Sequence, residues 1–214
     1  MANDKTLVRF NIKNAKYAIM TDEETFAAPV SIGYSDSMAL EANYAEKPIY
    51  GDGRVVLTVP NDKGKTGTLA LLTIDEDYEI AMKRRMKTQN GTAEIKQTAS
   101  VVHALYFETE FVGESGDLQT AKTILYGVTT GRPSETYNQT TDDINNNNVS
   151  YPLTIKGIKM KDSAGEDYKD DKGNTVYAWQ ETSIPGDTGY DDFGKTISAP
   201  KAPANTQTTD PLNL

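Results

Sequence analysis

The sequence of 214 residues predicts a mainly β fold of the α+β class, a β-sandwich or partly closed barrel with one flanking α-helix. The clearest strand is at residues 101–112, where Leu105, Phe107 and Phe111 share one parity. Short apolar runs bounded by Gly, Asn, Asp or Pro recur along the chain, as in sheets built from successive hairpins. Apolar residues have helical spacing in a single stretch, which begins after Asp75.

The N-terminal part of the chain predicts three strands. Residues 6–12 and 16–20 are apolar-rich, and the turn-forming pair Lys13-Asn14 separates them, so we expect an arm or edge strand followed by a second strand. Residues 37–44 alternate with a period of two, which predicts a half-buried strand.

The stretch from residue 48 to 89 predicts a turn, two strands, a loop and the helix. The glycines of Tyr50-Gly51-Asp52-Gly53 allow positive φ and predict the turn. Residues 54–59 predict a strand that stops at Pro60, and residues 61–66 are polar and predict an exposed loop. Residues 68–74 carry apolar side chains on both faces, so we expect a strand that is covered on both sides.

The helix is expected to run from residue 76 to 86. Its first turn follows the acidic segment Asp75-Glu76-Asp77, which suits the free N–H groups and the positive end of the helix dipole. Tyr78, Met82 and Met86 lie four residues apart and form one apolar stripe, the pattern of a helix packed against a core. Asn90-Gly91 is expected to terminate this segment.

The second half of the chain predicts further hairpins. Residues 121–130 are expected to pair with residues 101–112, with acidic and aromatic side chains on the outer side of the ribbon. Residues 151–160 predict a strand, and the apolar parity changes at Gly157, which indicates a β-bulge. Residues 175–182 predict the last strand.

We expect one domain over residues 1–182, with an N-terminal arm and long loops, and a separate tail over residues 183–214. The polar residues 133–148 and the charged residues 162–174 are expected to form a surface loop and a hairpin turn. Beyond residue 183 the chain is rich in Gly, Pro, Asp, Thr and Ala, so it offers little apolar surface to offset the entropy of ordering. An extended or disordered tail is the expectation there.

Composition argues against several classes of function. The formal net charge is -9, and the chain contains no cysteine. The single basic cluster, Lys83, Arg84, Arg85 and Lys87, is expected to be a solvated helix face, so tight DNA binding is disfavoured. No apolar run is long enough to span a membrane, and the N-terminus lacks the pattern of a secretory signal.

The sequence predicts neither an active site nor a cofactor or metal. His103 is the one histidine, and without cysteine or a second histidine it cannot build a usual zinc site. No Gly-x-Ser-x-Gly segment accompanies it. Glu108 and Glu110 are expected to be neighbours on one strand face rather than carboxylates on opposite sides of a cleft. The acidic residues between 162 and 174 do not have the spacing of an EF-hand loop.

Several segments resemble, in order, the major tail proteins of long-tailed non-contractile phages of Gram-positive hosts. The N-terminal segment Ile12-Lys13-Asn14-Ala15-Lys16-Tyr17-Ala18 resembles the start of that family. The alternating strand at residues 37–44, the turn Ile49-Tyr50-Gly51-Asp52 and the strand leading into the acidic-capped helix follow in the family's order. Tyr126-Gly127-Val128 and Tyr151-Pro152-Leu153-Thr154-Ile155-Lys156-Gly157 resemble its closing strands. The similarity spans roughly residues 10 to 160, and each motif alone is weak.

The resemblance implies a tail-tube-like fold and a structural role in the virion. Subunits of this family form hexameric rings that stack into a tube for genome delivery, with the tape-measure protein in the channel and a tail terminator at its end. DNA would pass through without specific binding, no membrane would be involved, and the protein would be made in the host cytoplasm. Candidate contacts between subunits are then the polar loop with the preceding turn (Asp52, Asn61, Asp62, Lys63 and Lys65) and the N-terminal arm (Asp4, Lys5 and Leu7).

Two alternatives belong to other classes. A carbohydrate- or receptor-binding β-sandwich adhesin would need an aromatic platform, for which Trp179 with Tyr177 is the candidate. A glycosidase would need two carboxylates at catalytic spacing, which the sequence does not indicate. We expect a protein that is not an enzyme.

Overall fold

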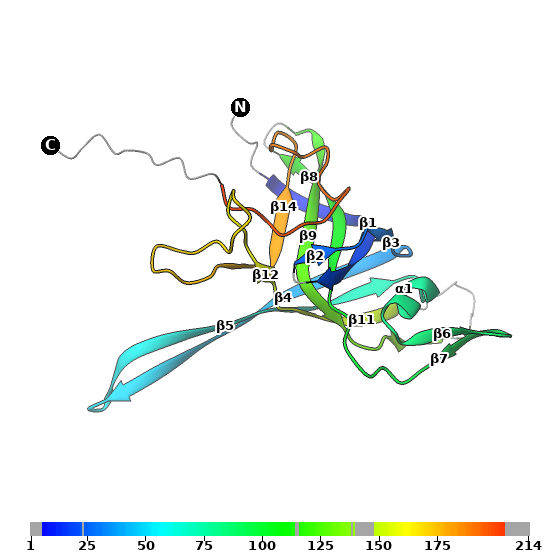
Figure 1. Cartoon of the computed structure of the whole chain (residues 1–214), viewed down its shortest axis with the longest axis horizontal. Helices are drawn as coiled ribbons and strands as arrows, with labels where there is room; N and C mark the ends of the chain where they lie inside the picture. Colours follow the sequence, from blue (N-terminus) through cyan, green and yellow to red (C-terminus); the bar gives the residue numbers. More distant parts are fainter. Residues whose placement is uncertain (1–5, 23, 114–115, 138, 140–147, 204–214) are drawn as a thin grey trace.

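The computed structural model describes residues 6–22, 24–113, 116–137, 139 and 148–203, and the prediction of a mainly β fold with one flanking helix is confirmed. Figure 1 shows one large antiparallel sheet with a short helix beside it. The described elements are β1 (Thr6–Asp22), β2 (Thr25–Phe26), β3 (Val30–Ser31), β4 (Ser35–Gly51), β5 (Arg54–Leu71), α1 (Glu76–Ala81), β6 (Arg85–Thr88), β7 (Gly91–Glu94), β8 (His103–Gly113), β9 (Leu118–Thr130), β10 (Ser134–Glu135), β11 (Val149–Ile155), β12 (Ile158–Lys159), β13 (Tyr177–Ala178) and β14 (Gln180–Ser183).

The main sheet has the order β2-β1-β8-β9-β11-β5-β4 and curls on itself. Strands β1 and β4 approach each other without being paired, so the sheet is a partly closed barrel with an opening between them. β3, β10 and β14 add short pairings to β1, β11 and β9. Among the described helices, none has the length and apolar character needed to cross a membrane.

The sheet buries apolar side chains on both of its faces. The main core lies on the face that α1 covers, and it includes Tyr17, Leu69, Leu105 and Tyr151. A second cluster on the other face includes Ala104, Tyr106, Ile124, Tyr126 and Ile197. Because adjacent residues of a strand point to opposite faces, Leu105 and Tyr106 belong to different cores.

The two strands expected at residues 6–12 and 16–20 are one strand, β1, which pairs with β8 over most of its length. The predicted turn at Lys13-Asn14 is an irregularity in the register, and Asn14 has a positive φ of 53°. Asparagine tolerates this conformation, so the strand is bent without being ended. Lys13 Nζ lies 2.6 Å from Glu110 Oε1 across the pair.

The helix begins where the sequence predicts, but it is shorter than predicted. Asp75 caps it, since the carboxylate accepts a hydrogen bond from the N–H of Tyr78 at 2.9 Å. The helix ends at Ala81, and β6 and β7 form a hairpin whose tip contains Asn90-Gly91. Gln89 and Asn90 form the turn of this hairpin, and Gly91, with a φ of 148°, begins β7 opposite Thr88. Met86, expected in the core, is half exposed on this hairpin.

The hairpin of β8 and β9 is confirmed, whereas the expected exposure of its outer side is wrong. Tyr106 and Tyr126 are buried there. Residues 193–202, which the sequence predicted as part of an extended or disordered tail, pass over this face and bury Ile197, Ala199 and Ala202. The described residues 184–203 contain no named strand, and they pack through a few apolar side chains that carry no periodic signal.

Glycines mark the place where strand β9 changes partner. The second half of β9 pairs with β11 and its first half pairs with β14. Gly127 has a φ of 62° at this point, and a Cβ there would lie 2.3 Å from the carbonyl oxygen of Gly157. The parity change at Gly157 is also explained, because Ile155 joins the main core and Ile158 joins the second one. Gly157 lies between β11 and β12, where the strand is interrupted rather than bulged.

Candidate functional site

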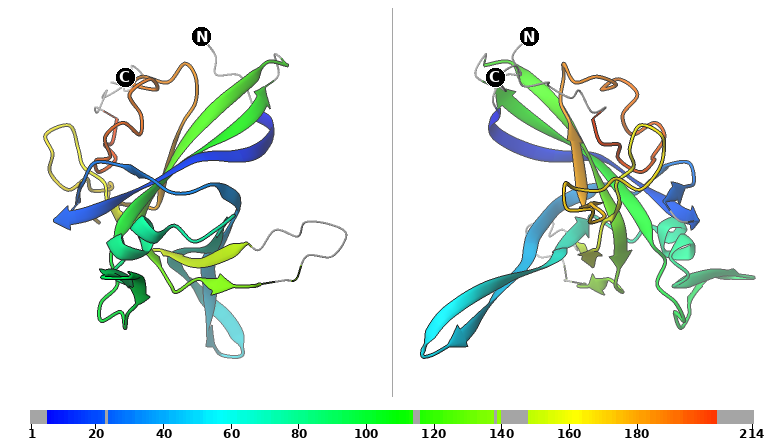
Figure 2. Two further views of the ribbon diagram at one scale, coloured as in Figure 1. Left: turned by 90° about the vertical axis from the view of Figure 1, so that its right-hand side faces the viewer. Right: turned by 60° about the vertical axis from the view of Figure 1, so that its left-hand side comes forward.

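The most prominent surface feature is a two-stranded arm formed by the distal parts of β4 and β5, residues 44–62. Figures 1 and 2 show it leading away from the body of the molecule. Strand β11 pairs with β5 only from Lys65 onward, so the arm has no third strand among the described residues. Every arm residue except Gly51 is exposed. An isolated two-stranded ribbon is marginally stable in water, and it gains stability when one of its faces is covered.

One face of the arm is apolar and uncovered. Ile49 lies directly opposite Leu57, and Lys47 lies opposite Val59, so these four side chains point to the same side. Ile49, Leu57 and Val59 are 46%, 56% and 41% exposed. We call Ile49, Leu57 and Val59 the apolar stripe. The opposite face carries the cross-strand pairs Glu46 with Pro60 and Pro48 with Thr58, and it also exposes Tyr44, opposite Asp62, and Tyr50, opposite Val55.

The tip of the arm is the turn that the sequence predicts. Asp52 and Gly53 have φ values of 50° and 75°, and Gly51 pairs with Arg54 across the turn. Two successive positive φ values are characteristic of a type I′ turn, which matches the twist of the flanking strands. Asp52, a predicted subunit contact, therefore lies at the outermost point of the arm.

The predicted loop at residues 61–66 is wrong, because these residues belong to β5. Asn61 and Asp62 lie at the root of the arm, where Asp62 Oδ1 accepts a hydrogen bond from the N–H of Gly64. Lys63 is exposed, and Lys65 Nζ donates to Gln180 Oε1 at 2.8 Å. Pro60 does not end the strand because an open edge does not require its N–H. The five predicted loop and turn residues are therefore separated into a tip and a root.

The predicted N-terminal arm is only partly described. Asp4 and Lys5 lie outside the described residues, and Leu7 belongs to β1. In this strand Thr6 is paired with Gly113 and Val8 with Val112. From Thr6 onward the chain is therefore part of the sheet.

The basic cluster at residues 83–87 is not a uniformly solvated face. Arg84 is fully buried, and its guanidinium contacts Glu79, with Nη2 2.7 Å from Oε1. It also donates to the carbonyl oxygens of Thr130 and Gly131 at 3.0 and 2.7 Å. Lys87 is exposed. No signal in the sequence distinguishes Arg84 from its neighbours, because its acceptors come from the end of β9.

His103 is buried beside this ion pair. Its Nδ1 lies 3.2 Å from the carbonyl oxygen of Val101 and its Nε2 lies 3.0 Å from the hydroxyl of Tyr78. Since a carbonyl only accepts, Nδ1 carries the proton and Nε2 accepts from Tyr78. Burial, with a smaller contribution from the charge of Arg84, lowers the pKa of His103 to about 4. No group of His, Cys, Asp or Glu in the described residues is arranged to hold a metal ion.

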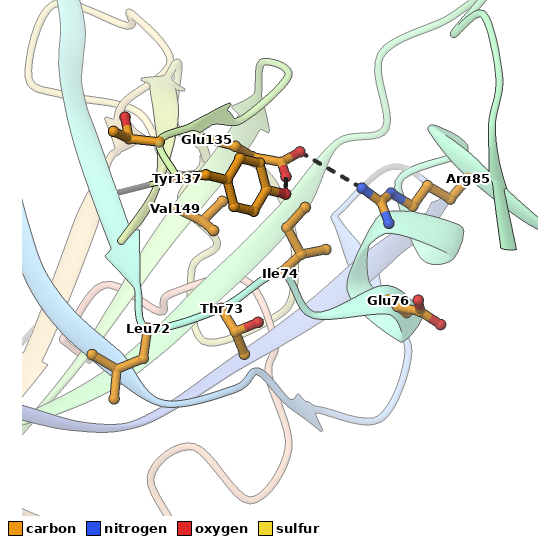
Figure 3. Close-up of a pocket in the computed structure, with 9 residues that line it drawn as sticks. Leu72, Thr73, Ile74, Glu76, Arg85, Glu135, Tyr137 and Val149 are labelled. Atoms are coloured by element: carbon orange, nitrogen blue, oxygen red, sulfur yellow. Dashed lines mark hydrogen bonds and ion pairs between the residues drawn. The ribbon is translucent and has the colours of Figure 1, made fainter. Parts of the chain in front are cut away.

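A polar pocket lies near β6 and β10 (Figure 3). Arg85 Nη2 lies 3.6 Å from Glu135 Oε1, and the hydroxyl of Tyr137 donates to the same carboxylate. Glu76 accepts a hydrogen bond from Thr92. The charged side chains that line this pocket are therefore occupied by one another or by neighbouring hydroxyls.

A groove of about 690 Å³, lined by both apolar and polar side chains, lies at the opening of the barrel. Residues 9–12 of β1 form one bank and residues 35–40 of β4 form the other, with Phe107 and Leu72 also lining it. Phe10 is 41% exposed and Leu72 is 39% exposed. The charged residues of the groove are Arg9 and Asp36, one on each bank.

Trp179 and Tyr177, the candidate aromatic platform of an adhesin, are not both exposed to solvent. Trp179 is partly buried and packs against the main core. Its ring approaches Gly157, where a Cβ would lie 2.4 Å from Trp179 Cδ1. Tyr177, at 53% exposure, remains available to solvent, but the two rings do not present a free pair.

No protein-family model matches the sequence, and no curated protein matches it either. Among solved structures, a chain of the anti-feeding prophage baseplate, determined by cryo-electron microscopy with six-fold symmetry, is similar in fold. It has 6% sequence identity and a TM-score of 0.40, and the alignment covers 84% of this chain and 96% of that chain. A similarity of this degree carries no argument about function.

Proposed function

We propose that this protein is a structural subunit of a phage tail tube, with no catalytic role. The observation that carries the proposal is the arm, an exposed two-stranded ribbon with an uncovered apolar stripe. Full burial of an aliphatic side chain contributes about 1.5–3 kcal/mol of favourable free energy. Burial of the exposed surface of three such residues would therefore favour association of the subunits. The order of the tail-protein motifs in the sequence supports the same assignment.

In this proposal the subunits form hexameric rings that stack into a tube within the virion. The tape-measure protein and the tail terminator are the expected partners, and DNA passes through the channel without specific binding. A net charge of -9 is compatible with a channel that does not retain phosphates. Synthesis in the bacterial host cytoplasm belongs to the same proposal.

The experiment is negative-stain electron microscopy of the concentrated protein together with light scattering after size exclusion. We expect rings or tubes from the full chain. In the matched control variant, residues 46–60 are replaced by Asn-Gly, which joins the directly opposed Ala45 and Asn61 by a hairpin turn. This variant should remain folded and monomeric. A full chain that stays monomeric at every concentration would refute the proposal, whereas an arm-trimmed variant that forms normal tubes would show that the arm is not the contact that builds them.

A further inference from the structure

The arm and the groove are parts of the same strand and cannot meet within one molecule. Residues 35–40 of β4 line the groove, and the strand continues from there into the arm at Tyr44. Figures 1 and 2 show the arm leading outward from this point. The pairing of β4 with β5 continues to the tip, so the arm does not fold back. The arm therefore cannot fill the groove of its own molecule.

The arm of a second copy offers exposed apolar side chains to the apolar side chains of the groove. The arm spans roughly 25 Å from Tyr44 to Gly51 at about 3.3 Å per residue. Its stripe of Ile49, Leu57 and Val59 is apolar, and so are the groove residues Phe10, Ile12, Met38 and Leu40. Proline at positions 48 and 60 interrupts the N–H groups of the arm's open edges, which disfavours strand addition and favours docking through the face.

The charges around the two surfaces are also complementary. The face with the stripe carries Lys47 and, opposite Gly51, Arg54, with no acidic residue. Asp36 lies on the β4 bank of the groove, and Asp52 at the tip has the sign to match Arg9 on the other bank. In the part of the chain that the structure describes, none of these five residues forms an ion pair within the molecule. Such groups set the orientation of a complex more than its affinity.

We propose that the arm of one copy docks by its apolar stripe into the groove between β1 and β4 of a second copy. This inference rests on the proposed function and names the partner of the arm. Each copy then provides one arm and one groove, so the contact is heterologous, and such contacts close into rings or continue as filaments.

Cysteine cross-linking tests the contact directly, because the chain contains no cysteine of its own. Leu57→Cys places a thiol on the stripe, and Ser37→Cys places one on an exposed, nearly isosteric groove position. When the two variants are mixed under oxidising conditions, we expect disulfide-linked dimers. Thr58→Cys is the matched control, since residue 58 is adjacent but lies on the other face. Its cross-linking to Ser37→Cys should be at least about fivefold slower, because a disulfide needs Cα atoms within about 7 Å.

The charges provide a second readout in the same assay. Lys47→Glu in the Leu57→Cys copy should slow cross-linking, and Asp36→Lys in the Ser37→Cys copy should restore it. Glu46→Lys, on the opposite face of the arm, should leave the rate unchanged. Equal rates for positions 57 and 58, or a disulfide within one chain of the double variant Leu57→Cys/Ser37→Cys at high dilution, would overturn the inference.

The two proposals fail in different ways. If the protein forms tubes but the Leu57→Cys and Ser37→Cys variants do not cross-link, the docking of the arm is refuted and the proposal of a tube subunit stands. Specific 57–37 cross-linking without rings or tubes would retain the docking and refute the tube.

Discussion

Arg84 and Glu79 form an ion pair that water does not reach. An isolated buried charge is costly, so each of the two residues depends on the other. The carbonyls of Thr130 and Gly131 satisfy further guanidinium protons, and the rings of Tyr78 and Tyr151 lie 5.7 and 5.5 Å from its central carbon. The pair thus attaches the segment after α1 to the end of β9.

Replacement of Arg84 by Met should lower the free energy of unfolding by about 3–5 kcal/mol, because Glu79 is left buried without a cation. Urea unfolding followed by circular dichroism measures the loss. The double variant Arg84→Met/Glu79→Leu should recover much of it, since both charges are removed. Lys87→Met, at an exposed position of the same basic cluster, should change stability by no more than about 0.5 kcal/mol. A loss below about 1 kcal/mol for Arg84→Met would contradict this account.

His103 should make the fold sensitive to acid. Its pKa is about 4 in the folded protein, against the ordinary histidine value of 6.5 in the unfolded chain, so between these values the unfolded chain binds more protons. The stabilising contribution is complete above pH 6.5 and decreases as the pH falls toward 4. At about pH 5 the protein should have lost about 2 kcal/mol relative to about pH 7.5 through this residue alone.

The measurement is urea unfolding of the wild type and His103→Gln at about pH 7.5 and about pH 5. Carboxylates also titrate in this range, and the comparison between the two proteins removes their common effect. The difference in stability between the two pH values should be about 2 kcal/mol smaller in His103→Gln. Equal pH dependence in both proteins would show that His103 does not titrate as proposed.

At the scale of elements, two glycines act by separable mechanisms, Gly127 within β9 and Gly165 in the turn between β12 and β13. Gly127 has a positive φ, and a Cβ there would also meet the backbone of Gly157. Gly165 has a φ of 90°, and a Cβ added to it would have no neighbouring atom within 4 Å. The two residues therefore differ in crowding and share the unfavourable backbone conformation.

Gly165→Ala should lower the free energy of unfolding by about 1–2 kcal/mol, which is the strain of the backbone conformation alone. Gly127→Ala should cost about 1–3 kcal/mol more, because β9 must move away from Gly157. Thermal and urea unfolding of both variants gives the difference directly. Equal losses would mean that crowding at Gly127 is relieved without cost.

The sequence predicts elements whose signals are local and misses those set by distant neighbours. The β8–β9 hairpin follows from the alternation of Leu105 and Phe107 and from its turn. The extra length predicted for α1 comes from Met86, which fits the helical spacing of Tyr78 and Met82 but follows a change of backbone direction at Lys83, where φ is 58°. The prominence of the arm depends on the absence, among the described residues, of a third strand beside the part of β5 that precedes Lys65, which no local pattern encodes.

The same limit applies to the candidate site. Asp52 was predictable, because the turn of the arm is encoded by its glycines. The apolar stripe was not predictable, because Ile49 lies opposite Leu57 only in the register that β4 and β5 adopt. Burial of Arg84 requires acceptors from residues 130 and 131, which lie far away in the chain.

At the scale of the whole molecule, residues 193–202 complete the second core. Ile197 and Ala199 cover the outer face of β8 and β9, and the ring of Tyr106 lies so close to Gly194 that a Cβ there would be 2.1 Å from it. Without this segment Tyr106 and Tyr126 would face water on a sheet that is already covered on its other side. Segment and sheet therefore stabilise each other.

Truncation after residue 183 should lower the free energy of unfolding by at least about 3 kcal/mol, because burial of Ile197 alone contributes about 1.5–3 kcal/mol and the two tyrosines lose their cover. The exposed face should also bind the dye ANS. Truncation after residue 203 is the matched control, since it keeps every described residue of the segment, and it should leave the unfolding transition unchanged. If both truncated proteins unfold like the full chain, the second core does not contribute to stability, and the face under residues 193–202 would be free to receive another molecule.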